Sequence, residues 1–355
     1  MTIKQGRIDV HHHLIPPAFR AAMAKNGLDK VAGAPLPEWD PATSLDVMDV
    51  NGIQTALLSL SAPGVFFNSK PEAIALAREC NEYAAQVKQD HPGRLGYFAV
   101  LPMPFTQEAC AEAIYALDHL NADGIVLLGS TDGYFLGDAR FEELMAELDR
   151  RQAAVFVHPN LHKTSEEIGL DMPGFLMEFL CDTTRAAANM VLQGVLERYP
   201  NIKWILSHAG GFIPYIAWRL SLANMFPNYN DNAPEGVMTY LKRYYYDTAL
   251  SPSPFAMRAL EELVEPDHIL FGSDFPFAPA PITGVCTKAI DGDLFDVEKR
   301  YGVNRGNALK LFPQYCLSDE KAEPLPILEK RTFKDKLKSR AISGAVSIFD
   351  HIRNR

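Results

Sequence analysis

Histidine and aspartate residues recur in this sequence directly after short apolar runs, at positions where reactive side chains could gather. His11 and His13 follow RIDV, His158 follows AVFV, His208 follows WILS, and Asp274 ends LFGSD. Imidazole nitrogens and a carboxylate are good ligands for a borderline-soft divalent metal such as zinc. The same groups can carry protons in general acid–base catalysis. These five residues are therefore candidates for a metal-dependent active site.

The spacing within the first run separates three consecutive histidines. Residues two apart on a strand point the same way, so His11 and His13 share a face and His12 points oppositely. We expect His11 and His13 to bind a metal, with a third imidazole and a carboxylate completing the set. A lone histidine at a strand end is more often a packing residue, but the coincidence of five groups favours a site. The other histidines lie in expected helices or loops or at a strand start, and are interpreted as structural: His91, His119, His162, His268 and His351.

The elements that position these groups alternate along the chain. Eight apolar runs are expected to be strands buried on both faces: residues 7–13, 55–61, 95–102, 124–129, 153–159, 202–208, 244–249 and 268–274. Helical periodicity lies between them, for instance over 71–90, 108–121, 141–151 and 183–199. This alternation predicts a (β/α)₈ TIM barrel, with an open doubly wound sheet as the alternative. In a barrel the strand ends meet at one mouth, which would bring the five groups together.

The barrel domain is expected to span residues 1–317, followed by a C-terminal helical extension over 318–355. This extension opens with a polar, proline-containing linker and ends in a basic amphipathic segment, which favours a packing or dimer arm. Residues 16–41 form a long first loop, rich in Ala, Pro and Gly, that is expected to shape a pocket entrance.

Composition restricts the class of protein. With 47% hydrophobic and 22% charged residues, the 355-residue chain has an ordinary globular mix. It has no run of about 18 apolar residues and no apolar signal segment, so we expect no membrane span and a cytoplasmic location. A net charge of −10 without a basic stripe argues against nucleic acid. The five scattered cysteines include no CxxC pair and are expected to be reduced.

Four motifs carry a resemblance to a known family. DVHHH, VFVHPN, ILSHAGG and LFGSDFPF, in this order, resemble the amidohydrolase superfamily. Within it they are similar to the decarboxylase branch, which includes aminocarboxymuconate-semialdehyde, resorcylate and salicylate decarboxylases. The resemblance covers residues 7–313 and implies a (β/α)₈ fold, homodimers, and one bound zinc or manganese ion. It implies the following roles: His11, His13, His158 and Asp274 as metal ligands, and His208 as a catalytic histidine.

Two further features of the resemblance bear on metal number and substrate. Strand four, GIVLLGS, lacks the lysine that bridges two metals in binuclear members, which favours a single metal. Arg219, eleven residues after His208, resembles an arginine that binds a substrate carboxylate in the neighbouring subunit's site. A salt bridge within the same chain to an acidic neighbour such as Asp247 is the alternative. The stretch DPATSLDVMD lacks a second substrate arginine of the muconate type, which disfavours a dicarboxylate.

The opening IDVHHHLIPP and the later LLSLSAPGV resemble the 6-methylsalicylate decarboxylase group. The sequence therefore predicts decarboxylation of a small aromatic carboxylate, a hydroxybenzoate, by protonation of its ring carbon. Asp274 or His208 would deliver the proton, and Phe19, Phe275 and Phe277 are candidates to hold the ring. The rival interpretation is a hydrolase that opens a lactone or an amide with metal-activated water.

Overall fold

The structure, a computed structural model, describes residues 6–318 and, beyond them, residues 320, 321, 323–325, 330, 332, 334, 337, 338, 340–342 and 344. The expected C-terminal extension over 318–355 thus lies largely outside the described residues, and its role as a dimer arm stays a prediction. Within the described part, no helix is both long and apolar enough to cross a membrane.

One parallel sheet of eight strands organises the chain. Its strands neighbour one another in sequence order: β1 (Arg7–His13), β4 (Ile53–Ser59), β5 (Leu95–Val100), β6 (Gly124–Leu128), β9 (Ala154–His158), β10 (Lys203–Leu206), β11 (Tyr245–Asp247) and β12 (Ile269–Leu270). Backbone hydrogen bonds from Val10 N to Phe271 O (3.0 Å) and from His13 N to Phe275 O (2.7 Å) join β1 to the chain after β12. The sheet therefore closes on itself, which confirms the TIM barrel and excludes the open sheet.

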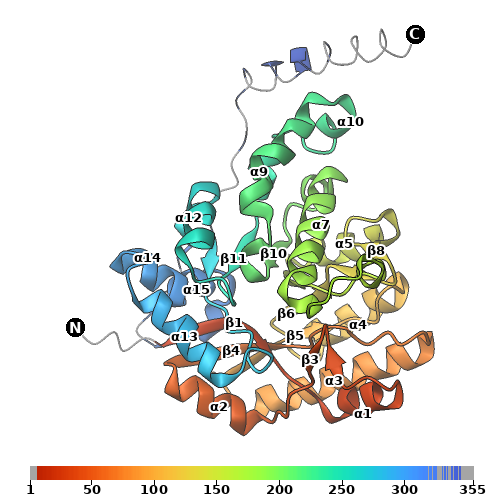
Figure 1. Ribbon diagram of the computed structural model, residues 1–355, viewed down its shortest axis with the longest axis vertical. Helices are drawn as coiled ribbons and strands as arrows, with labels where there is room; N and C mark the ends of the chain where they lie inside the picture. The colour runs from red at the N-terminus through yellow and green to blue at the C-terminus, as the bar shows by residue number, and fades with distance from the viewer. Residues whose placement is uncertain are drawn as a thin grey trace.

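Helices cover the outside of this barrel (Figure 1). The larger ones are α2 (Pro41–Val50), α3 (Lys70–Asp90), α4 (Thr106–Asp118), α5 (Glu142–Arg150), α7 (Glu178–Leu192), α9 (Ile213–Ser221), α12 (Pro254–Leu263) and α13 (Ala280–Asp291). Several begin at the capping residues that their sequences supply. Asp40 accepts a hydrogen bond from Thr43 N at the start of α2, and Ser253 accepts one from Ala256 N at the start of α12.

Alternate residues of the strands face two different clusters. In β9, Val155 and Val157 belong to the cluster that packs under the helices, whereas Phe156 belongs to a second cluster. The ring of Phe156 lies 5.6 Å from that of Phe98 on β5 and 4.9 Å from the imidazole of His11. The second cluster thus fills the barrel interior beneath His11. Burial on both faces explains why the strand sequences are almost continuously apolar.

Some predicted elements end earlier than expected. β10 and β12 stop before His208 and Asp274, whose φ angles are 51° and 62°. A left-handed backbone conformation cannot continue a strand, so both residues lie in turns just beyond it. The helix expected over 183–199 is two helices, α7 and α8 (Val195–Arg198), because Gly194 between them has a φ of 75°.

The first loop is more structured than expected. It holds α1 (Pro17–Lys25) and a small hairpin of β2 (Lys30–Val31) and β3 (Ala34–Pro35). The hairpin meets the loop after β9, where Phe175 N donates to the carbonyl oxygen of Ala32 at 3.1 Å. These two loops lie together over the barrel mouth.

Candidate metal centre

His11 and His13 turn their rings to the same side of β1, as their spacing predicts. Both side chains are fully buried, and their Nε2 atoms lie 3.1 Å apart. His158, the last residue of β9, has its ring centroid 4.8 Å from that of His13. Three imidazoles from two strands therefore meet at the mouth of the barrel.

Asp274 completes this group. Its Oδ1 lies 3.0 Å from His13 Nε2 and 3.2 Å from His11 Nε2. The candidate ligand atoms of these three residues and of His158 all lie within 4.8 Å of one another. Three nitrogen donors and one carboxylate at this spacing suit a single four-coordinate divalent ion. The residues present therefore fit one metal.

Each ligand ring is held so that Nε2 is left for a metal. The Nδ1 atoms face protein oxygens instead: Asp247 Oδ2 at 2.6 Å for His11, the Ser59 carbonyl at 3.0 Å for His13, and the Pro159 carbonyl at 2.8 Å for His158. A ring that donates a proton from Nδ1 carries its lone pair on Nε2, which is the form that binds a metal. The surrounding protein thus orients all three rings.

Burial and neighbouring charges set the protonation of these groups. Burial, reinforced by neighbouring histidines, holds the pKa of His158 well below its ordinary value, and burial is also the main cause that lowers the pKa of His13. For His11 burial acts in the same direction, but Asp247 and Asp274 outweigh it and raise the pKa to about 10. Burial alone would raise the pKa of Asp274, yet His11 and the other rings hold it well below its usual range. The raised pKa of His11 and the lowered pKa of Asp274 thus share one cause, their mutual attraction, and a divalent ion bound by these groups would take the place of the proton.

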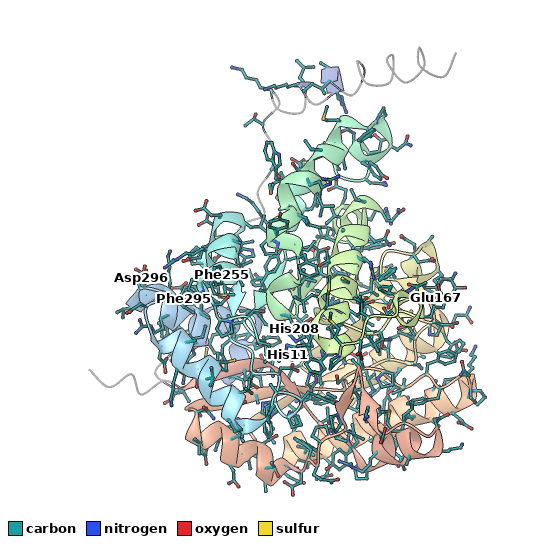
Figure 2. All side chains as sticks on the ribbon, in the orientation of Figure 1. His11, Glu167, His208, Phe255, Phe295 and Asp296 are labelled. Carbon is teal, nitrogen blue, oxygen red and sulfur yellow. The ribbon has the colours of Figure 1, made fainter. Side chains whose placement is uncertain are left out.

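His208 lies beside the ligand group, in a 3₁₀ turn (His208–Gly210) that follows β10. Its Nε2 lies 3.4 Å from Asp274 Oδ2, the oxygen that does not face His11 and His13. Its Nδ1 is buried and has no hydrogen-bond partner among the residues that the structure describes. Figure 2 labels His11 and His208 close together, and their ring centroids are 4.9 Å apart. His208 therefore contacts the ligand set through Asp274 without belonging to it.

The glycines of the HAGG motif are required by the path of this turn. Gly210 and Gly211 have φ angles of 72° and 62°. A Cβ atom at Gly210 would lie 2.5 Å from the ring of Tyr246, and one at Gly211 would lie 2.4 Å from the carbonyl oxygen of Leu180. Only glycine meets both the conformation and the close approach, so the motif fixes where His208 stands.

His12 points away from the site, as expected. Its Nδ1 lies 3.0 Å from Asp9 Oδ2, and its Nε2 lies 2.9 Å from Ser44 Oγ. Ser44 also accepts a hydrogen bond from Trp39 Nε1 at 2.8 Å. Both ring nitrogens of His12 are thus engaged in a buried polar network behind the barrel mouth.

A cavity of about 450 Å³ opens onto His158, His208 and Asp274. The rest of its wall is mainly apolar, with two serines: Val31, Ala34, Ser61, Phe175, Leu176, Phe179, Leu180, Leu250, Ser251, Phe277, Ala278, Pro279 and Ile282. The first loop thus contributes to the wall, as expected, through its hairpin. No lysine or arginine is among these lining residues. A larger hollow of about 1210 Å³ lies at the opposite ends of the strands, against Gly124 and Lys203, and neither His208 nor any candidate metal ligand lines it.

The three aromatic candidates separate in the structure. Phe277 lines the cavity, and its ring centroid lies 5.3 Å from that of His13. Phe19 is buried in the core on α1, and Phe275 packs against His12 at 5.1 Å. The structure does not bring these two residues to the cavity. Phe275 follows Asp274 directly and turns to the other side of the chain, whereas Phe19 packs in the core.

Arg219 also lies away from the cavity of its own chain. It is exposed on α9 and makes no ion pair with the residues that the structure describes. The predicted alternative, a salt bridge to Asp247, is wrong. Asp247 is fully buried, and its carboxylate is hydrogen bonded to His11 and to backbone amides.

Sequence reasoning missed Asp247 as a member of the site. The strand expected over 244–249 placed Asp247 inside it, so the rule that functional groups stand at strand ends did not select this residue, whereas β11 in fact ends at Asp247. Its side chain contacts a ligand histidine without itself reaching the cavity, so only the tertiary arrangement shows what it does.

Comparison with known proteins shows the family to which the chain belongs. Residues 8–314 match the amidohydrolase family. The chain is 37% identical over 315 residues to the 6-methylsalicylic acid decarboxylase of Penicillium expansum, an alignment that covers 87% of this chain and 97% of that one. Among solved structures, an amidohydrolase II aligns with a TM-score of 0.81 at 32% identity over 86% of this chain and 99% of that one.

A dihydroxybenzoic acid decarboxylase from Polaromonas sp. JS666, with bound manganese and the inhibitor 2-nitroresorcinol, aligns with a TM-score of 0.76. At 23% identity, over 88% of this chain and 98% of that one, this likeness shows the fold. The family match spans nearly the whole barrel, and the candidate ligands His11, His13, His158 and Asp274 lie within it. The chain therefore belongs to the amidohydrolase family.

Proposed function

We propose that this protein is a metal-dependent, nonoxidative decarboxylase of a salicylate-type hydroxybenzoate such as 6-methylsalicylate. The observation that carries the proposal is the apolar cavity that opens onto His158, His208 and Asp274. Its volume of about 450 Å³ is within the range of small-molecule sites. The similarity to the Penicillium expansum enzyme supports the same substrate class.

One divalent ion would be held by His11, His13, His158 and Asp274. Three imidazole ligands favour Zn²⁺, and the manganese of the Polaromonas structure makes Mn²⁺ the alternative. Bound there, the ion supplies positive charge that polarises the carboxylate and phenolic oxygens of the substrate.

The reaction adds one proton to the ring carbon that bears the carboxylate. The carbon–carbon bond then breaks, CO₂ leaves, and the electrons of that bond restore the aromatic ring. His208 and Asp274 both line the cavity, with 3.4 Å between Nε2 and Oδ2. We propose that this pair holds the proton and that one of the two delivers it as a general acid.

The cavity wall favours a substrate with a single carboxylate and an apolar ring. Phe175, Phe179 and Phe277 offer aromatic contacts to such a ring. Because none of the lining residues is a lysine or an arginine, a second carboxylate would be buried without a cation from this chain.

We propose that the chain forms a homodimer in which Arg219 reaches the neighbouring site. On α9, which projects from the barrel in Figure 1, Tyr215 and Trp218 are 87% and 74% exposed beside Arg219. Large aromatic residues of this kind are enriched at protein interfaces. A guanidinium can hold a carboxylate through two parallel hydrogen bonds.

A cytoplasmic location remains a prediction of the sequence.

The test is an assay of CO₂ release from a panel of hydroxybenzoates by the metal-loaded protein. We expect 6-methylsalicylate to yield 3-methylphenol and CO₂, with faster turnover than 2,6-dihydroxybenzoate or a dicarboxylate. Simple lactones and anilides serve as controls for the hydrolase alternative. Hydrolysis of a lactone without CO₂ release from any hydroxybenzoate would replace the proposal with that alternative.

A further inference from the structure

We infer that Asp247 is a positioning residue that holds the ring of His11 in the tautomer needed to bind a metal. The inference rests on the proposed metal site and adds a residue to it. Asp247 is the last residue of β11 and is fully buried. It does not line the cavity, so it acts through His11 and not on the substrate.

Both oxygens of Asp247 are occupied by specific donors. Oδ2 lies 2.6 Å from His11 Nδ1. Oδ1 accepts hydrogen bonds from the backbone amides of His208 at 2.8 Å and Ala249 at 2.9 Å. The two amides orient the carboxylate, and an ionised carboxylate only accepts hydrogen bonds. His11 must therefore carry a proton on Nδ1 and present Nε2 to the other ligands.

This dependence on a carboxylate distinguishes His11 from the other two candidate ligand histidines. The Nδ1 atoms of His13 and His158 face main-chain carbonyl oxygens, which no substitution at the acceptor residue removes. His13 Nδ1 also lies 3.1 Å from Ser59 Oγ, but a hydroxyl can donate or accept and so does not fix a tautomer. The tautomer of His11 is set by a carboxylate that one substitution can change. The same carboxylate also binds the backbone of His208, whose φ of 51° needs support from its surroundings.

Asp247→Asn isolates the contact with His11. The amide oxygen can replace Oδ1 and keep both backbone hydrogen bonds, which leaves the NH₂ group facing His11 Nδ1. Nδ1 must then accept a hydrogen bond, so the proton moves to Nε2, the atom that should bind the metal. Turning the amide around would restore the acceptor for His11 but would oppose two backbone N–H groups with a donor.

Asp9 provides a matched control on the other side of His11. It is fully buried, and its Oδ1 accepts from the backbone amides of His11 (3.1 Å) and Ser273 (3.0 Å). Its Oδ2 faces Nδ1 of His12, which is not a ligand, at 3.0 Å. Asp9→Asn therefore makes the same chemical change but shifts the proton of His12. The rings of the candidate ligands keep the oxygens that accept from their Nδ1 atoms.

The experiment measures Zn²⁺ affinity of the full chain by competition with a chromophoric chelator, with thermal unfolding of the metal-free proteins in parallel. We expect Asp247→Asn to weaken Zn²⁺ binding by about 10–100-fold, the usual effect of losing a partner of a metal-binding histidine. Asp9→Asn should stay within about threefold of wild type, although both variants lose folding stability. Equal affinity changes in the two variants, or none in either, would overturn the inference.

A second measurement requires no variant of Asp247. In Zn²⁺-loaded wild-type protein with ¹⁵N-labelled histidine, His11 should show a protonated Nδ1 and a metal-bound Nε2. An unprotonated Nδ1 at His11 overturns the inference even if Asp247→Asn does not fold. Failure of the proposed reaction looks different, since wild type would then bind Zn²⁺ with this tautomer and release no CO₂.

Discussion

Asp274 Oδ2 lies 3.4 Å from His208 Nε2, whereas Oδ1 of the same carboxylate faces His11 and His13 of β1. The Asp274 carboxylate thus connects the candidate metal ligands His11 and His13 with His208. The two roles can be separated by experiment, because loss of a ligand removes the metal and loss of His208 removes only a proton carrier.

Purified protein should contain about one divalent ion per chain, since four ligand atoms form one site. His158→Ala and Asp274→Ala should each lose the metal and the turnover together. Elemental analysis of the purified proteins checks both statements. Two ions per active chain would contradict the mononuclear site.

His208→Ala should keep a metal content near that of wild type and lower the rate by roughly 10²–10⁴-fold, the range for losing general acid–base help. The reason is that His208 is not among the four candidate ligands, although it contacts Asp274 and its ring lies beside that of His11. Rate and metal content are measured on the same preparation. Loss of the metal together with the rate would make His208 a ligand.

Arg219→Lys keeps the positive charge but loses the forked pair of donors. We expect KM for the carboxylated phenol to rise about tenfold, because a hydrogen bond to a charged group contributes roughly 1.5–3 kcal/mol. Thermal unfolding should not change, since the side chain is exposed and makes no ion pair within the described chain. Steady-state kinetics and a melting curve test this, and an unchanged KM would argue against substrate contact.

Mixed dimers test whether the site is shared between subunits. Arg219→Ala and His208→Ala chains should each have very low activity alone. If Arg219 acts in the neighbouring site, a heterodimer of the two contains one intact centre and regains activity. Dual affinity tags allow the heterodimer to be purified before assay. An inactive, verified heterodimer would confine Arg219 to its own subunit or to a structural role.

His12→Asn should leave metal content unchanged and activity within a few-fold of wild type, because the ring faces away from the ligands. The asparagine amide can still donate to Asp9, but it does not reach Ser44 as Nε2 does at 2.9 Å. We expect the free energy of unfolding to fall by about 1–3 kcal/mol, the cost of leaving a buried polar group unpaired. Urea denaturation measures it, and a lost metal would show that His12 supports the ligands directly.

Asp182 on α7 should make folding stability depend on pH. Burial outweighs the hydrogen bonds from Ser130 and from Asn160 N and raises the pKa of Asp182 to about 7. Between about pH 4 and pH 7 the folded chain holds this proton and the unfolded chain does not, so stability falls as pH rises.

Asp182→Asn removes the pH dependence that comes from this carboxyl group. For one proton, the free energy of unfolding changes by at most about 1.4 kcal/mol per pH unit. As pH rises through this window, the urea midpoint of the variant should therefore rise relative to that of wild type. A difference that stays constant with pH would show that Asp182 is ionised in the folded protein throughout.

The sequence by itself determined the alternation of strands and helices and the bounds of the first strand, although β10 and β12 end before the residues expected to end them. Period-two alternation is a local property of extended chain, so it placed His11 and His13 on one face and turned His12 away. The bounds 7–13 for the first strand agree with β1. The barrel rule that functional groups stand at strand ends then selected His158, His208 and Asp274.

Only the tertiary structure decided which of these groups meet and what surrounds them. His208 and Asp274 lie in left-handed turns just beyond their strands. These turns place Asp274 within the group of candidate ligands and His208 beside that group. Periodicity cannot predict the path of a loop. The sequence therefore did not show that Phe175, in the loop after β9, lines the cavity, or that Phe19 does not. Asp247 contacts His11 across 236 positions of sequence, a pairing that depends on the closure of the barrel.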